Sequence, residues 1–131
     1  MIKQINFFVK SAKKDFQFYK NVFGAVEQHI PDDHLEKDTI ALFKVGNISF
    51  GIVDESPDEG RKSAASLEST PIAFEYHTND VLDIAERALA AGGKYGIPST
   101  SENPIFITPD GKEVCNIVDL SGYYWSICKE R

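Results

Sequence analysis

The feature that most constrains this chain is an order of predicted elements that occurs twice. In the first half the predicted strand "KQINFFV" leads into the predicted helix "SAKKDFQFYKNVFG", and the strand candidates "AVEQHI", "TIALFKV" and "ISFGIV" follow. In the second half "PIAFEYH" leads into "NDVLDIAERALAAGG", and "KYGIPS", then "PIFIT" or "EVCNIVD", then "YYWSICK" supply the strands. Two copies of one βαβββ unit therefore predict an α+β fold.

Apolar positions at the start of each half support the repeat. The alternating residues Ile5, Phe7 and Val9 recur 67 positions later as Ile72, Phe74 and Tyr76. Because side chains alternate between the two faces of a strand, each set predicts a buried face. The two predicted helices deviate from this shift by a residue or two, so the repeat is clearer in the order of the elements than in the identity of the residues.

Capping and turn residues set the predicted boundaries of the helices and strands. Ser11 is the predicted N-cap of the first helix and Gly24 its C-terminal stop. Asn79 or Asp80 caps the second helix, which the pair Gly92-Gly93 ends. The pair Gly46-Asn47 predicts a tight turn between the last two strands of the first half.

The stretch "DLSGYYWSICK" near the end predicts a hairpin. Asp119 suits the first position of a type I turn and Gly122 its last. This turn places Cys115 opposite or nearly opposite Cys128 on the paired strand, so the two thiols are predicted to be close. They are expected to act as small apolar fillers rather than as a disulfide.

The length of 131 residues predicts one domain with its own core. We divide this single domain, residues 1–131, into a first module over residues 1–55, a polar linker over 56–70 and a second module over 71–131. The linker prediction depends on Pro57, Gly60 and several serines.

Composition excludes several classes of partner. The formal net charge of −6 argues against nucleic acid, because phosphate binding needs a basic stripe. No window reaches the apolar length of a membrane span, and the start is too polar for a signal peptide, so we expect a cytoplasmic protein without membrane contact. The 2 cysteines lack CxxC spacing, which predicts reduced thiols.

Four motifs in order resemble the vicinal oxygen chelate superfamily, which holds glyoxalase I, bleomycin-resistance proteins and extradiol dioxygenases. They are "FQFYKNVFGA", "PIAFEY" followed by "NDV", "ALAAGGK", and the terminal "DLSGYYWSI". The resemblance covers almost the whole chain. It implies that the two βαβββ modules form a curled mixed sheet, a glyoxalase-like cup.

In this family metal ligands point inward from the first and last strands of each module. By register the four positions fall on Gln4, on Ser49 or Gly51, on Pro71 and on Ser126. Only Gln4 carries a side chain that serves there in some members, whereas divalent cations normally need three or more imidazole or oxygen ligands. We therefore predict no metal and no other cofactor, although a divalent metal on other residues stays possible.

The predicted site consists of side chains that alternate toward the cup. Glu75 and His77 share one face of the fifth predicted strand and are the candidate catalytic pair, for acid/base chemistry or hydrogen bonding. The other two histidines, His29 and His34, flank a stretch with the composition of a solvated turn. Cys128 shares the cup-facing side of the last strand. The candidate ligand-binding residues are Gln4, Asn6, Phe8, Ser49, Gly51, Ala73, Glu75, His77, Tyr124 and Ser126.

Apolar walls with a few converging polar groups suit a small organic molecule, unless Phe8 and Tyr124 fill the cup themselves. The first function hypothesis is metal-independent small-molecule binding, of the drug-resistance or sequestration type. The alternative is an enzyme: a glyoxalase-type lyase or isomerase or a dioxygenase with a non-standard metal site, or a metal-free enzyme that uses Glu75 and His77. A dimerising domain without a ligand is a third possibility.

The family also implies an assembly, because its cups often form by pairing modules across a dimer. Exposed strand edges give this acidic chain a reason to pair. We therefore predict a homodimer.

Overall fold

The computed structural model of the chain describes residues 1–29 and 39–130. His34 and most of the loop predicted around it lie outside these residues. Among the described residues, no helix is both long and apolar enough to cross a membrane.

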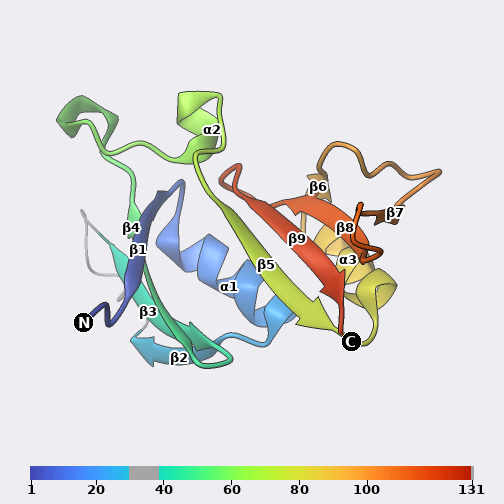
Figure 1. The fold of residues 1–131 in the computed structure, drawn as a ribbon. Helices are drawn as coiled ribbons and strands as arrows, with labels where there is room; N and C mark the ends of the chain where they lie inside the picture. The colour runs from blue at the N-terminus through green and yellow to red at the C-terminus, as the bar shows by residue number, and fades with distance from the viewer. Residues whose placement is uncertain (30–38, 131) are drawn as a thin grey trace.

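The first module has the predicted strand, helix and three strands (Figure 1). Its sheet has the order β1-β4-β3-β2, in which β1 runs parallel to β4 and the other neighbours are antiparallel. The elements are β1 (Ile5–Val9), α1 (Ala12–Phe23), β2 (Val26–His29), β3 (Ile40–Val45) and β4 (Ile48–Asp54).

The second module repeats this topology, with the order β5-β9-β8-β6 and β5 parallel to β9. Both sequence candidates for its middle strand form strands: "EVCNIVD" contains β8, and "PIFIT" contains a short extra strand, β7, that pairs with β8. The elements are β5 (Ala73–Thr78), α3 (Val81–Ala90), β6 (Lys94–Tyr95), β7 (Phe106–Ile107), β8 (Glu113–Val118) and β9 (Tyr124–Lys129).

The segment between the modules contains a 3-10 turn, η1 (Pro57–Glu59), and a short helix, α2 (Ala64–Leu67). Ala64 is buried, and the backbone N–H of Ala65 donates to the carbonyl of Ser121 over 2.8 Å. Gly122 lies against this helix, where a Cβ would be 2.6 Å from the nitrogen of Ala65. Glycine is therefore required at this position, where φ is also +90°.

The helix ends agree with the predicted capping residues. The Ser11 side chain accepts a hydrogen bond from the N–H of Lys14, and Gly24 ends α1 in the left-handed conformation. For α3 the N-cap is Asp80, whose carboxylate accepts from the N–H of Asp83 over 3.0 Å.

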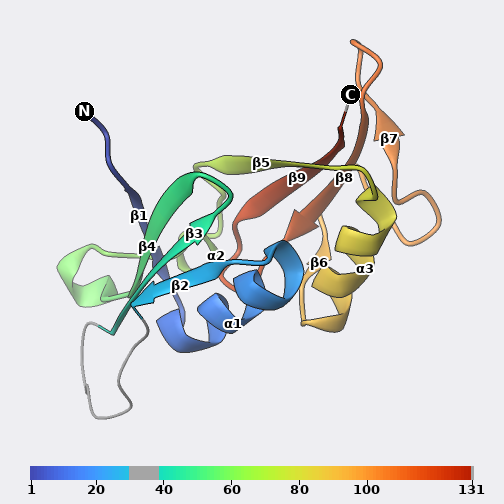
Figure 2. The same cartoon turned by 90° about the horizontal axis from the view of Figure 1, so that it is seen from below.

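One aromatic core joins the two modules. Both helices pack on their sheets and against each other, and Figures 1 and 2 show α1 beside α3. The ring of Phe23 from α1 stacks on Trp125 from β9 at 4.2 Å between centroids, and Phe7 from β1 lies 5.3 Å from Phe74 from β5. The opposite face of each sheet points outward, and no helix in the described part of the chain covers it (Figure 2).

The turn between β8 and β9 connects the second module to the first through buried polar groups. The backbone N–H of Gly122 donates to the carbonyl of Asp119, as expected for the predicted turn. The Asp119 carboxylate accepts from the Tyr19 hydroxyl over 2.6 Å and from Trp125 Nε1 over 2.9 Å. It also accepts from the backbone N–H groups of Ser121 and Tyr123, each over 3.0 Å. One carboxylate therefore satisfies four donors from both modules.

Ser121 in the same turn makes a second connection. Its hydroxyl donates to Asp15 Oδ2 over 2.5 Å and accepts from the backbone N–H of Lys10 over 2.8 Å. Asp15 is only 1% exposed, and burial, together with the nearby charges of Asp119 and Asp54, raises its pKa to about 7 against the effect of the Ser121 hydrogen bond. Burial is the largest cause of this shift, and it favours the protonated form of the Asp15 carboxyl group.

Cys115 and Cys128 are nearly opposite each other, as predicted, but the pairing is offset by one residue. In the hairpin Cys128 pairs with Val114, and Cys115 pairs with Ile127. Neighbouring pairs point to opposite faces of a sheet, so Cys115 lies on the helix-covered side and Cys128 on the outward side. Both cysteines are free and buried.

Candidate functional site

Predicted site residues of the first module form one group on the outward face of its sheet. Gln4 Nε2 donates to Asn6 Oδ1 over 2.7 Å. Gly51 lies directly beneath this pair, because a Cβ there would collide with the Asn6 amide oxygen and lie 2.8 Å from Gln4 Nε2. Gln4 and Ser49 also line a hollow of about 150 Å³ at the start of β1 and β4.

The second group lies on the outward face of the other sheet. The Ser126 hydroxyl donates to Asn116 Oδ1 over 2.8 Å, and Asn116 Nδ2 donates to the carbonyl of Ile97. Gly96 lies against the ring of Tyr124, which a Cβ there would approach to 2.8 Å. These contacts place residues 96 and 97 over part of this face. In the described part of the chain, no strand pairing joins this sheet to the sheet of the first module. The structure therefore holds the predicted residues in two groups.

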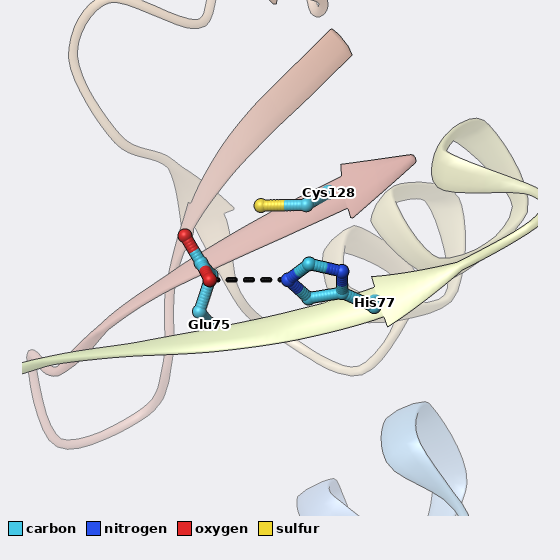
Figure 3. Close-up of side chains that lie close together, drawn as sticks. All are labelled: Glu75, His77 and Cys128. Carbon is cyan, nitrogen blue, oxygen red and sulfur yellow. Dashed lines mark hydrogen bonds and ion pairs between the residues drawn. The ribbon is translucent and has the colours of Figure 1, made fainter. Parts of the chain in front are cut away.

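Three side chains that could bind a metal ion lie close together on this face: Glu75, His77 and Cys128 (Figure 3). His77 Nε2 lies 3.0 Å from Glu75 Oε2, and one ligand atom from each of the three residues lies within 4.8 Å of the others. The hydrogen bond from His77 lowers the pKa of Glu75, whereas burial and the negative charge of Glu75 raise the pKa of the Cys128 thiol.

A groove of about 280 Å³ opens between the modules, where the β3–β4 turn faces β5. Glu75 and His77 are the polar residues among its wall-forming side chains, which are otherwise mostly apolar. We call it the seam groove. It is lined by Ile5, Val45, Gly46, Ile48, Phe50, Phe74, Glu75, Tyr76, His77 and Trp125.

Comparison with known proteins settles the family. The model of the glyoxalase/bleomycin resistance protein/dioxygenase superfamily matches residues 1–125. The chain belongs to this superfamily. No curated protein sequence matches it significantly.

Solved structures of this superfamily share the fold at low identity. A glyoxalase/bleomycin resistance protein/dioxygenase family enzyme from Burkholderia phytofirmans PsJN is 14% identical with a TM-score of 0.70, over 97% of this chain and 96% of that one. The fosfomycin resistance protein FosX from Mesorhizobium loti is 16% identical with a TM-score of 0.69, over 100% and 92%. A FosX mutant from Listeria monocytogenes, complexed with Mn(II) and 1S,2S-dihydroxypropylphosphonic acid, is 17% identical with a TM-score of 0.68, over 98% and 88%.

The residues that the resemblance places at the superfamily's metal positions do not fit a divalent ion. Pro71 has no donor atom in its side chain, and Gly51 has no side chain. The Ser126 hydroxyl is held by Asn116, and the Gln4 amide by Asn6. Hard and borderline divalent ions prefer carboxylate or imidazole ligands, which none of these positions offers.

Sequence reasoning missed the residues that build the walls of the seam groove. Phe74 was assigned to the buried face of its strand and is half-buried, and Phe50 and Trp125, for which no role was predicted, are buried. They still line a groove, because β1 and β5 are edge strands that face each other without pairing. Asn116 was also missed, although its position opposite Ser126 in the predicted hairpin was a usable signal.

Proposed function

We propose that this protein binds a small organic molecule in the seam groove and needs no metal ion to do so, as a drug-resistance or sequestration protein would. The observation that carries the proposal is the lining of the groove: aromatic and aliphatic walls with Glu75 and His77 as the polar residues. Apolar walls with a few polar groups are typical of small-molecule sites.

The charge of Glu75 favours a positively charged ligand. The pKa of Glu75 is lowered, so its carboxylate is ionised at neutral pH. The side chain is 58% exposed and can therefore meet a ligand from solution. An aromatic or apolar molecule with a cationic amino group fits both the walls and this charge.

The chain carries its own reporter of binding, because Trp125 is its single tryptophan and lines the groove. We expect 1-naphthylmethylammonium, titrated in the presence of a chelator, to change the fluorescence of Trp125 saturably. Naphthalene-1-sulfonate, which has the same rings and the opposite charge, is expected to bind more weakly. Equal binding of the two probes, or no saturable change with either, would contradict the proposal.

Replacing Glu75 by glutamine is expected to weaken binding of the naphthylmethylammonium ion about two- to fivefold, as the loss of a partly exposed ion pair predicts. Folding should be unchanged, because the side chain is on the surface. Glu102→Gln removes an exposed carboxylate elsewhere and is the matched control. An identical loss in both variants would show that net charge, and not the groove, attracts the probe.

We further propose a homodimer. Each sheet ends in an edge strand, β1 or β5, that has a free side, and Ile2, Ile5 and Ile72 near these edges are exposed. Free edges and exposed apolar side chains favour association with a second chain. Light scattering at micromolar concentration is expected to give twice the mass of one chain, and a monomer mass would refute the prediction.

A further inference from the structure

We propose that Glu75, His77 and Cys128 form a zinc site on the outward face of the second sheet. The site uses residues other than those at the superfamily's metal positions, and it does not depend on a ligand in the seam groove.

The backbone places the three ligands close together before any metal arrives. His77 and Cys128 are direct partners in the parallel pairing of β5 with β9, and Glu75 precedes His77 by two residues on the same face. Two adjacent, hydrogen-bonded strands therefore fix all three Cα positions. Figure 3 shows the thiol and the imidazole on the same side of the sheet as the carboxylate.

The distances between ligand atoms suit a tetrahedral ion after small side-chain rotations. Zinc bonds of about 2.0 to 2.3 Å at tetrahedral angles separate ligand atoms by about 3.3 to 3.6 Å. In the structure His77 Nε2 and Glu75 Oε2 are 3.0 Å apart, and the three ligand atoms lie within 4.8 Å of one another. Changes of about 1 Å, within the reach of the Glu75 and Cys128 rotamers, complete the geometry.

The kind of donor selects the metal. A thiolate, an imidazole and a carboxylate together favour Zn²⁺, whereas Mg²⁺ and Ca²⁺ take oxygen ligands only. Binding replaces the S–H bond of Cys128 by a Zn–S bond and releases that proton to solvent. No oxidant or reductant is involved.

The surroundings give the ion access and a free coordination position. Cys128 is buried, but the side chains of Glu75 and His77 are 58% and 37% exposed. Lys112 is a cation close enough to act on Glu75, and its Nζ lies 4.0 Å from Asp110 Oδ2, so its charge is partly offset. Water can supply the fourth donor.

The test uses reduced, metal-free protein and two ions. We expect one Zn²⁺ per chain by isothermal titration calorimetry, and one Co²⁺ per chain with a thiolate-to-cobalt charge-transfer band in the near ultraviolet. Zn²⁺ should displace Co²⁺ and remove the band. Cys128→Ser should abolish the band, and His77→Gln should weaken Zn²⁺ binding by about tenfold or more.

Matched controls test whether these three side chains, and no others, bind the ion. Cys115→Ser removes the other thiol of the same hairpin, on the opposite face, and should keep the band. Ser126→Ala alters a superfamily metal position and should keep the Zn²⁺ affinity. His77 is exposed, so His77→Gln should keep the fold even if Cys128→Ser does not.

Three results would overturn the proposal: no thiolate band in the wild-type protein, loss of the band in Cys115→Ser, or normal Zn²⁺ binding by His77→Gln. The groove probe is titrated with a chelator present, and zinc is titrated without the probe. Failure of either proposal is therefore seen separately.

Discussion

Asp119→Ala is expected to lower the free energy of unfolding by about 3 to 5 kcal/mol, the cost of removing one partner from a buried, charge-assisted set of hydrogen bonds. The substitution leaves four donors without their acceptor: the Tyr19 hydroxyl, the Trp125 indole and two backbone N–H groups. Asp119 is 6% exposed, so water cannot easily replace the carboxylate. Urea unfolding followed by tryptophan fluorescence measures the change.

A second aspartate provides the comparison for this prediction. The Asp80 carboxylate lies at the surface and accepts the N-cap hydrogen bond from the N–H of Asp83, so Asp80→Ala should cost about 1 kcal/mol. If Asp119→Ala costs no more than Asp80→Ala, the four-donor network does not stabilise the contact between the modules.

Asp15→Asn is expected to stabilise the protein at pH 8, by an amount on the order of 2 to 4 kcal/mol. The folded pKa of Asp15, about 7, lies above its ordinary value of 3.8, so the folded state binds the proton more tightly than the unfolded chain does. The stability from this group is therefore complete below about pH 4 and is lost as the pH rises to about 7. Asparagine is neutral throughout and can still accept the Ser121 hydrogen bond.

The pH dependence is the sharper measurement for this variant. Urea unfolding at a series of pH values between about 4 and 8 should show a smaller decline in stability for Asp15→Asn than for the wild-type protein. Asp58→Asn changes an exposed carboxylate and should follow the wild-type curve. Parallel curves for Asp15→Asn and the wild-type protein would show that Asp15 does not titrate as its burial predicts.

Local chemistry in the sequence was enough to predict much of the fold. Ser11, Gly24 and Asp80 act where capping preferences place them, and the shift between Ile5 and Ile72 does identify two modules of equal topology. These features depend on neighbours along the chain, which a single sequence displays directly.

Contacts across the chain were not predictable in the same way. Asp119 was recognised as a turn residue, but its role as acceptor for Tyr19 depends on how the two modules pack. Likewise, a hairpin register known only to within one residue cannot decide whether Cys115 and Cys128 share a face. The candidate site shows the same difference: alternation correctly placed Glu75 and His77 on one face of β5, but it did not indicate the residues that line the seam groove.

The polar contacts of the β8–β9 turn also have a consequence for folding kinetics. Tyr19 and Asp119 are 100 residues apart in the chain, and Asp15 and Ser121 are 106 apart. Such contacts form only after most of the chain has been ordered, and the entropy of closing these long loops is lost before they stabilise anything. Neither half of the repeat can satisfy its buried donors alone. We therefore expect the duplicated modules to fold as one cooperative unit, slowly for its size, rather than as two small domains in series.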